Sequence, residues 1–442
     1  MIQRDSKNKT SIFRCPVHGS IPVSLQEKAI IDSRFFQRLR FISQLGFSSL
    51  VFPGAVHTRF SHSLGAMHLA GKIFNQLIKN SPLIQDIYSR KDLEYFREII
   101  RIAALLHDVG HPPFSHVAET ILPQRKEFLR FSVPGWIIDY QDKENQARHE
   151  DYSLALIWYF SVQYHDVLSE QEAKDVIAIL SGKEEVGVSF KQFKVSPFPL
   201  LRALINGELD ADRMDYLIRD SYYAGVTYGT FDLERIIQTV LIKIDEKEKY
   251  LQLALDEKGI PSYEDFLLSR KHMFYQVYHH KTSESFSYCF QQAIREKELV
   301  VEIDGDLDKY MAITEVDFWK KIQRNADKKW TSFLAHRKTL RPLIKIQRDK
   351  EFLSDQIIND LAANQIPCFT VKHKTCFTLQ TKNGIDSSTL FCRKHLLGTF
   401  KWLPIIQLSS LLEKEEEIYL QQLYTFEEKY RLAQDVLRKF FD

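Results

Sequence analysis

Histidine and aspartate residues that could bind a metal ion gather in the first half of the 442-residue chain. His107 and Asp108 are adjacent and directly follow the apolar run IIRIAALL, so we expect them at the end of a buried helix. A buried carboxylate needs a cation or several hydrogen-bond donors, because its desolvation is otherwise unfavourable. Imidazole and carboxylate groups together suit divalent first-row metals. The pair therefore predicts a metal site at this helix end.

Two further residues complete a set of four ligands. His62 stands in HTRFSH, at the expected start of another helix, and Asp212 stands in ELDADRMDYLIRD. Taken alone, His62 could be a buried or capping histidine, and Asp212 could be a helix cap or a salt-bridged residue. A second dipeptide of the same kind, His165-Asp166, lies in the polar context YHDVLSEQE and is interpreted as structural. The joint order H…HD…D along the chain favours the metal interpretation.

The periodicity of apolar residues predicts that a mainly α-helical body positions these ligands. An amphipathic helix is expected over residues 26–45, where Gly46 would end it, and a second one begins near Ser61. Further helices are expected at 93–107, 150–165, 168–181, 197–220, 262–296 and 418–441. Strand patterns come later in the chain, with hairpins expected at 242–255 and 366–380.

Composition and charge exclude several classes of protein. The 60 Lys+Arg residues nearly balance the 58 Asp+Glu residues, and this formal charge of +2 argues against a constitutive nucleic-acid binder. A hydrophobic content of 44% excludes disordered and fibrous classes. The five cysteines are scattered without a C-x-x-C pair and are interpreted as reduced thiols. Because the sequence shows no apolar targeting or membrane segment, we expect a cytoplasmic protein that does not contact a membrane.

The motifs resemble those of the HD-domain metal-dependent phosphohydrolases. The chain looks most like their deoxynucleoside triphosphate triphosphohydrolase branch, which includes the sterile-alpha-motif-containing human enzyme and bacterial dGTPases, through QLGFSSLVFPGAVHTRFSHSLG, LLHDVGHPPFSH, RHE and DADRMDYLIRDSYYAGV. This resemblance covers roughly residues 15–285. It implies an N-terminal segment at 1–25, a helical HD-domain core at 26–296 and a smaller α+β region at 297–442 that would contribute to an oligomer interface.

The resemblance implies how such an enzyme would work. The divalent metal ion would be held by His62, His107, Asp108 and Asp212. It would polarise the α-phosphate and orient an attacking water, and the sequence leaves its identity open among Mg, Mn, Fe, Ni and Zn. The products would be a deoxynucleoside and tripolyphosphate. Acid–base roles would fall to His116 as general acid, to His111 at the phosphate, and to His149 with Glu150 as a tuning pair.

The same resemblance assigns residues to the substrate. Because one metal ion cannot neutralise the roughly four negative charges of a triphosphate, basic residues would bind its oxygens, namely Arg59, Arg213, Arg270 and Lys281. The 3′ side of the sugar would be lined by Gln44, Tyr216 and Asp220. Leu45 and Tyr278 would crowd the 2′ position and disfavour ribonucleotides, with simple core packing as the alternative for both.

Regulation and assembly are further expectations of the resemblance. Nucleotide-activated members bind an allosteric nucleotide between subunits, and Asp32 and Arg40 match that site. Ser11, Cys15 and Asp256 replace residues that are expected there, so the activating nucleotide stays open. Relatives assemble as dimers of dimers, and a homo-oligomer, dimer or tetramer, is therefore expected.

The leading hypothesis is metal-dependent hydrolysis of deoxynucleoside triphosphates (dNTPs). One alternative is another HD-domain activity, on a nucleoside monophosphate, a cyclic nucleotide or guanosine tetraphosphate, and the Arg59 and Arg213 set disfavours it. Another is a catalytically silent nucleotide sensor, which would not need acid–base histidines. A nucleic-acid-binding scaffold is the least favoured alternative.

Overall fold

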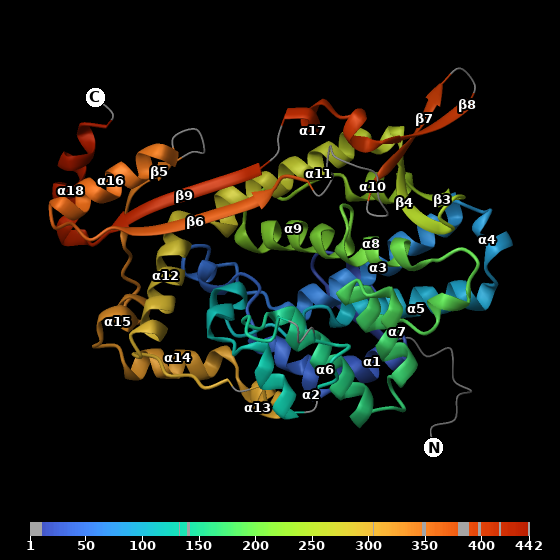
Figure 1. Cartoon of the computed structure of the whole chain (residues 1–442), viewed down its shortest axis with the longest axis horizontal. Coiled ribbons are helices and arrows are strands. Elements are labelled where there is room, and N and C mark those ends of the chain that lie inside the picture. Colours follow the sequence, from blue (N-terminus) through green and yellow to red (C-terminus); the bar gives the residue numbers. More distant parts are fainter. Residues whose placement is uncertain are drawn as a thin grey trace.

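The computed structural model describes residues 11–131, 133–138, 142–303, 305–346, 351–378, 389–396, 399–414 and 417–440. These residues form a large helical body and a smaller α+β part built from the C-terminal third of the chain (Figure 1). The expected mainly α fold is confirmed. Residues 1–10 of the expected N-terminal segment lie outside the described residues. None of the described helices has both the length and the apolar character needed to span a bilayer.

Three helices form the centre of the body: α3 (Arg59–Asn80), α5 (Arg90–Leu106) and α9 (Ala211–Ala224). Helix α3 packs against both α5 and α9. The surrounding helices are α1 (Leu25–Ile31), α2 (Arg34–Gln37), α4 (Ile84–Ile87), α6 (His149–Gln163), α7 (Glu170–Ser181), α8 (Phe198–Asn206), α10 (Leu233–Thr239), α11 (Ile260–Met273) and α12 (Lys281–Arg295). The expected helices at 93–107, 150–165 and 168–181, and the one from Ser61, are confirmed within a few residues.

Three expected helices are interrupted. The segment 26–45 is not one helix, because Ser33 caps the start of α2 with its side chain and 3₁₀ turns follow at Arg38–Phe41 and Gly46–Leu50. The segment 197–220 splits into α8 and α9, since the Asp210 side chain accepts a hydrogen bond from the Arg213 N–H and begins a new helix there. The segment 262–296 splits at a π-helical turn, Phe274–Tyr278.

The strands of the described residues form three sheets. They are β1 (Ser11–Cys15), β2 (Gly19–Val23), β3 (Val240–Asp245), β4 (Tyr250–Asp256), β5 (Arg341–Ile346), β6 (Phe369–Cys376), β7 (Phe391–Leu396), β8 (Thr399–Pro404) and β9 (Glu417–Thr425). Strands β1 and β2 form a hairpin, β3-β4-β7-β8 a sheet in which β4 and β7 are parallel, and β5-β9-β6 an antiparallel sheet. The hairpin expected at 242–255 is confirmed as β3-β4.

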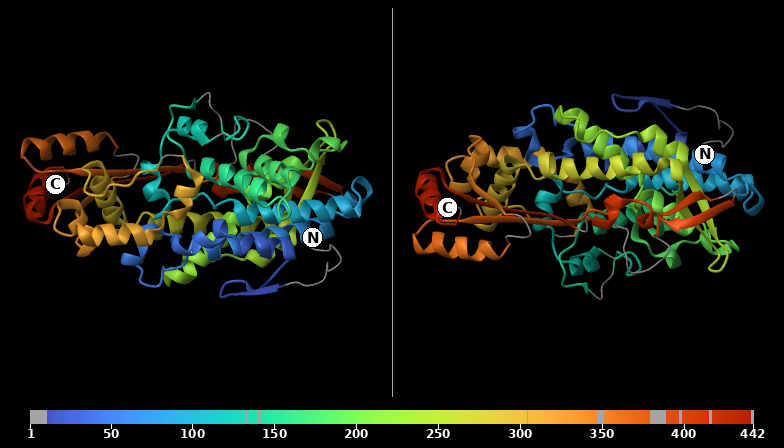
Figure 2. Two further views of the ribbon diagram at one scale, coloured as in Figure 1. Left: turned by 90° about the horizontal axis from the view of Figure 1, so that it is seen from below. Right: turned by 90° about the horizontal axis from the view of Figure 1, so that it is seen from above.

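Two expectations for the C-terminal part are wrong. The described part of the segment 366–380, residues 366–378, holds one strand, β6, which pairs with β9 rather than with a neighbour in sequence. The segment 418–441 begins as strand β9, and helical structure follows only from the 3₁₀ turn Glu427–Lys429, which leads into α18 (Tyr430–Arg438). Figure 1 shows β6 and β9 side by side, and in both views of Figure 2 most of the orange and red helices of the C-terminal part lie at one end of the molecule. The other helices of this part are α13 (Leu307–Ala312), α14 (Glu315–Arg324), α15 (Lys329–Ala335), α16 (Glu351–Ala363) and α17 (Ser410–Lys414).

A buried ion pair ties α1 to α5. Arg101 Nε donates to Glu27 Oε1 at 2.6 Å, and Arg101 Nη2 donates to Glu27 Oε2 at 2.8 Å. Both side chains are only 5% exposed. Gly71 of α3 leaves the space for this arginine, because a Cβ there would lie 2.8 Å from Arg101 Nη1.

We predict that Arg101→Met lowers the free energy of unfolding by about 3–5 kcal/mol, because Glu27 would remain buried without its counter-ion. Urea unfolding followed by circular dichroism measures the change. Arg90→Met on the same helix is the matched control, since the Arg90 side chain is 92% exposed and its pair with Glu94 is worth less than about 1 kcal/mol. Equal losses in the two variants would contradict the prediction.

Candidate metal centre and catalytic cluster

Three of the four predicted metal ligands meet at the centre of the body, and we call His62, His107 and Asp212 the metal cluster. They come from the first turn of α3, the C-terminal end of α5 and the first turn of α9. His62 Nε2 lies 3.4 Å from His107 Nε2 and 3.0 Å from Asp212 Oδ1, and His107 Nε2 lies 3.5 Å from Asp212 Oδ1. Tetrahedral ligands of a zinc-sized ion lie about 3.3 Å apart. The spacing therefore fits one divalent ion.

The second nitrogen of each imidazole is already engaged. His62 Nδ1 donates to Asp215 Oδ2 at 2.8 Å, and His107 Nδ1 donates to the carbonyl of Ala104 at 2.8 Å. Such partners set the tautomer of a ligating histidine and leave Nε2 free for the ion. Asp215 was not among the predicted site residues, although it lies three positions after Asp212 in the same motif.

Neighbouring carboxylates stabilise positive charge in the metal cluster. Burial opposes protonation of His62, yet the hydrogen bonds to Asp212 and Asp215 outweigh it and raise the pKa of His62 to about 10. Burial likewise opposes ionisation of Asp212, but the neighbouring His107 and His62 hold the pKa of this carboxyl below its usual range. These groups favour a cation in their midst, which is the condition for binding a metal.

Asp108, the fourth predicted ligand, lies beside the metal cluster. Its Oδ1 is 3.3 Å from His107 Nε2 and its Oδ2 is 3.6 Å from His62 Nε2. Oδ2 also accepts a hydrogen bond of 2.5 Å from Arg59 Nη1. Arg59, which was predicted to bind phosphate, is buried and pairs with Asp108 in this structure.

A second group of titratable residues contains His111, His116, Glu119 and His149, and we call it the catalytic cluster after the acid–base roles predicted for its histidines. The rings of His111 and His149 stack at 3.8 Å, and His111 Nε2 lies 3.4 Å from Asp108 Oδ1. Glu119 accepts from Nδ1 of both His116, at 3.0 Å, and His149. Burial opposes the charge on Glu119, but these two hydrogen bonds lower the pKa of its carboxyl.

Both Glu119 and Glu150 approach His149 Nδ1, and Glu119 also contacts His116. Glu150 lies 3.3 Å from His149 Nδ1, and its side chain is 60% exposed. No motif marked Glu119. Its spacing of three residues from His116 was the available signal, because that spacing places two side chains on the same face of a helical turn.

The loop between the two clusters is held in a tight conformation. A Cβ on Gly110 would lie 2.2 Å from the Ser153 nitrogen and 2.4 Å from the His149 carbonyl oxygen, so only glycine lets the loop approach α6 this closely. Phe114 and Ser115 have φ values of 61° and 56°, a left-handed conformation that is unfavourable for residues with side chains. This bend turns the chain just before His116.

The predicted phosphate-binding residues differ in position. Arg213 Nη1 donates to the Gly207 carbonyl at 2.8 Å, and the positive charge of Arg213 favours the ionised form of the Tyr216 hydroxyl. Arg270 donates to the carbonyls of Cys376 and Phe377. Its positive charge also favours the ionised form of the Tyr216 hydroxyl. Both arginines therefore surround the entry to α9. Lys281 is exposed at the start of α12, and no contact of its side chain joins it to this group among the described residues.

The predicted sugar-binding residues are buried or half-buried. Tyr216 lies with its ring 6.4 Å from that of His62 and 6.0 Å from that of Tyr278. Asp220 accepts from His57 Nε2 at 2.7 Å. Gln44 is buried, and its Oε1 has no hydrogen-bond partner among the described residues. Burial and then the Asp220 carboxylate raise the pKa of Tyr278 above its usual range.

Other predicted residues lie elsewhere. Leu45 is half-buried and immediately precedes the 3₁₀ turn Gly46–Leu50, outside any helix. Asp32 and Arg40 are both exposed; Asp32 pairs with Lys28, and the Arg40 guanidinium stacks 3.6 Å from the centre of the Phe60 ring. Both predicted allosteric residues thus have intramolecular partners.

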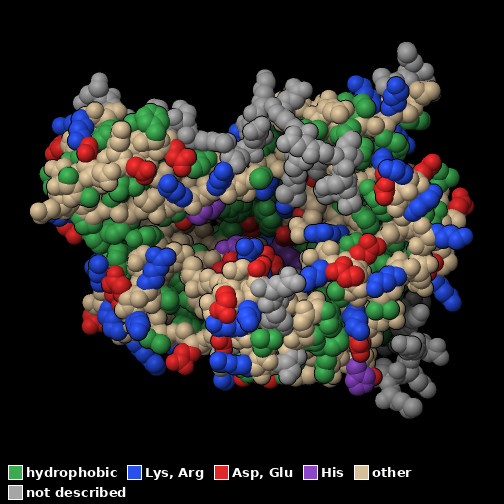
Figure 3. Space-filling model, in the orientation of Figure 1, with side chains coloured by type: hydrophobic (Ala, Val, Ile, Leu, Met, Phe, Trp, Pro, Cys, Tyr) green, Lys and Arg blue, Asp and Glu red, His purple; other side chains and the backbone are tan. Residues whose placement is uncertain are grey.

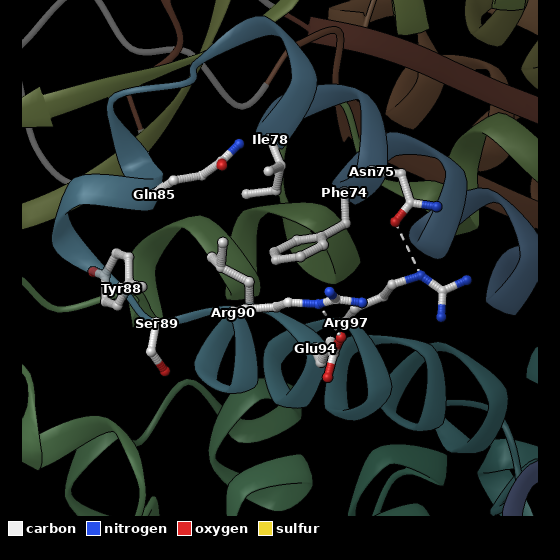
Figure 4. A pocket seen from close by; sticks show the side chains of 10 residues that line it. Phe74, Asn75, Ile78, Gln85, Tyr88, Ser89, Arg90, Glu94 and Arg97 are labelled. Carbon is white, nitrogen blue, oxygen red and sulfur yellow. Dashed lines mark hydrogen bonds and ion pairs between the residues drawn. The ribbon is translucent and has the colours of Figure 1, made fainter. Parts of the chain in front are cut away.

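The surface shows where a ligand could enter. Figure 3 shows a hollow in the middle of one face, below the strands β6 and β9, with histidine, basic and acidic side chains gathered around it. A separate pocket opens between α3, α4 and α5, where Arg97 donates to Asn75 (Figure 4). That pocket contains none of the predicted site residues.

We predict that Asp212→Ala lowers the metal content by about one ion per chain, since two imidazoles without the carboxylate hold a divalent ion poorly. The Asp212 side chain is 32% exposed, so the fold should survive. Elemental analysis after dialysis measures the loss. Asp166→Ala is the control, because Asp166 belongs to the other His-Asp dipeptide and its side chain is 94% exposed. Equal metal content in both variants would refute the assignment.

Comparison with known proteins gives two family matches. A profile described as the HD domain matches residues 59–195, and one described as the HD-associated region matches residues 231–358. The first match contains His62, His107 and Asp108, and Asp212 lies between the two matches.

Several relatives match over most of this chain. The chain is 34% identical over 281 residues to the uncharacterized protein YwfO of Bacillus subtilis, covering 63% of this chain and 54% of that protein. It is 26% identical over 328 residues to the deoxynucleoside triphosphate triphosphohydrolase SAMHD1 of Bos taurus, covering 72% of this chain and 52% of that protein. The chain thus matches little more than half the length of these relatives.

Two solved structures share the fold over nearly the whole chain. A hypothetical protein from Aquifex aeolicus has a TM-score of 0.73 and 26% identity, and the match covers 97% of this chain and 100% of that one. A phosphohydrolase from Bacteroides thetaiotaomicron has a TM-score of 0.67 and 25% identity, with 95% and 100% covered. With an HD domain at residues 59–195 followed by an HD-associated region at residues 231–358, the chain is an HD-domain protein.

Proposed function

We propose that the protein hydrolyses dNTPs to a deoxynucleoside and tripolyphosphate, with a divalent ion at His62, His107, Asp108 and Asp212. The observation that carries the proposal is the junction of the two clusters. Asp108 approaches two residues of the metal cluster, with Oδ2 near His62 and Oδ1 near His107. The same Oδ1 lies 3.4 Å from His111 of the catalytic cluster. A metal-bound phosphate would therefore lie within reach of acid–base residues.

The names of relatives support this choice of substrate. Proteins named deoxynucleoside triphosphate triphosphohydrolase SAMHD1 match 71–72% of this chain in Bos taurus and Mus musculus, at 26% and 27% identity. A homologue with the same name in Dictyostelium discoideum is 29% identical over 311 residues. We infer the same reaction, hydrolysis of a dNTP to a deoxynucleoside and tripolyphosphate, for this chain.

A divalent ion held by this set would polarise the α-phosphate and lower the pKa of a bound water. His116 is placed to act as the general acid. Its Nδ1 donates to Glu119, which leaves Nε2 to donate a proton to the departing 5′-oxygen. Because the His116 side chain is 67% exposed, Nε2 can reach a ligand. Glu119 would stabilise the imidazolium before the transfer and would share its charge with His149.

Phosphate binding would use groups that are already near the clusters. His111 Nδ1 is buried without a hydrogen-bond partner among the described residues, so a phosphate oxygen could satisfy it. Arg213 and Arg270 would neutralise the outer phosphates, and Arg59 would share its charge between Asp108 and the substrate. Lys281 would need to approach from its exposed position on α12.

The sugar side would select the deoxyribose. Gln44 Oε1 can accept a hydrogen bond from the 3′-hydroxyl, because it lacks another partner among the described residues. Asp220, fixed by His57, and Tyr216 would complete that wall. Leu45 and Tyr278 would leave no room for a 2′-hydroxyl.

We predict that the purified protein, incubated with each of the four dNTPs alone and in pairs with Mg²⁺ or Mn²⁺, releases tripolyphosphate. Phosphorus NMR distinguishes this product from pyrophosphate and orthophosphate, whose release alone would contradict the reaction. Binding of a dNTP without any product would indicate a nucleotide sensor instead. If one dNTP accelerates the hydrolysis of another, an activating nucleotide exists.

We predict that Glu119→Gln lowers kcat by about 10²–10⁴, because the neutral amide would no longer stabilise the His116 imidazolium. Steady-state kinetics with a dNTP measures the loss, and metal content should not change. Glu150→Gln is the matched control on the exposed side of His149, and we expect less than about a tenfold change there. A larger effect of Glu150→Gln than of Glu119→Gln would show that Glu150 is the functional partner.

A further inference from the structure

A third group of potential ligands lies where the C-terminal sheet meets the helical body. It consists of His279, Glu284 and His373. His279 follows the π-helical turn, Glu284 lies in the first turn of α12, and His373 is in the middle of β6. Glu284 Oε1 is 2.6 Å from His279 Nδ1 and 3.0 Å from His373 Nε2. Two segments that are distant in sequence, residues 279–284 and β6, thus direct two imidazoles at one carboxylate oxygen.

The donor set is that of a metal site. Two imidazole nitrogens and one carboxylate oxygen are preferred ligands of Zn²⁺, and an external ligand such as water can fill the fourth position. The separations of 2.6 and 3.0 Å would have to open only slightly to reach the spacing of about 3.3 Å in a tetrahedral site. Side-chain exposures of 19%, 11% and 28% leave a path for an ion to enter.

A purely hydrogen-bonded arrangement satisfies this group incompletely. His279 donates to Glu284 with good geometry. His373 Nε2 is buried and has no partner with hydrogen-bond geometry among the described residues, even though Glu284 Oε1 lies 3.0 Å away. The ring centroids of His279 and His373 lie 3.6 Å apart with the planes inclined at 33°, and a nitrogen of each ring approaches Glu284 Oε1. A bound cation would satisfy both imidazoles and the carboxylate together.

We propose that His279, Glu284 and His373 bind a second divalent ion, Zn²⁺, which fastens β6 to the start of α12. Two hydrogen bonds already join the same surfaces: Tyr424 to the Lys281 carbonyl at 2.8 Å and Tyr275 to the Tyr419 carbonyl at 3.3 Å. The ion would add a third attachment, next to Tyr278, and so hold the C-terminal sheet over the hollow of Figure 3. This site shares no residue with the metal cluster and does not depend on the proposed hydrolysis.

The test is the zinc content of full-length variants, measured by elemental analysis after loading with Zn²⁺ and dialysis. We expect about two ions per chain in the natural sequence, about one in His373→Gln, about one in Asp212→Ala and none in the double variant. His165→Gln is the control, because its side chain is 78% exposed and belongs to neither site, and it should keep both ions. Circular dichroism checks that each variant is folded.

A second readout covers the case in which His373→Gln does not fold. Co²⁺ added to Asp212→Ala should give the visible absorption of a tetrahedral site at about one ion per chain, and Zn²⁺ should raise the Tm of this variant. Absence of both effects would overturn the proposal. Equal zinc in the natural sequence and in a folded His373→Gln variant would also overturn it, since any second ion would then lie elsewhere, for example at the catalytic cluster.

Discussion

The buried carboxylate of Asp215 is the interaction on which the geometry of the site depends. It accepts hydrogen bonds from His62 of α3, from Arg219 of its own helix α9, and from His18 at the turn between β1 and β2. Gly65 makes this possible, because a Cβ there would lie 1.9 Å from Asp215 Oδ1. The two carboxylate oxygens of Asp215 therefore set the distance between α3 and α9, the tautomer of His62 and the position of the N-terminal hairpin.

The candidate metal ligands could be picked out from the sequence because His62, His107 and Asp212 each stand in a recognisable motif at a helix end. The partners that orient these ligands were harder to predict. Asp215 is one helical turn from Asp212, but only the packing of α3 shows that it meets His62. Glu119 lies 30 positions from His149 in the chain, whereas Glu150 is its neighbour. On a helix, adjacent residues point in different directions, so α6 turns Glu150 outward.

The fold predictions failed where local and tertiary preferences compete. Apolar residues at helical spacing over 26–45 indicated a long helix, but the Ser33 side chain competes for the backbone and divides it. The segment 417–425 carries Leu423 and Tyr424 buried on successive positions. Strand β9 is central in its sheet and covered on both faces, so it lacks the alternation by which strands are recognised.

Residues from the HD-associated region hold the loop of the HD domain in its unfavourable conformation. Glu315 of α14 accepts from the backbone nitrogens of both Phe114 and Ser43, at 2.9 and 2.7 Å. Tyr310 of α13 donates to the Gly110 carbonyl at 2.6 Å. Left-handed residues such as Phe114 are disfavoured by about 1–2 kcal/mol each, so the surroundings must supply that energy. The region after residue 300 is therefore needed to place the catalytic cluster, whatever it contributes to assembly.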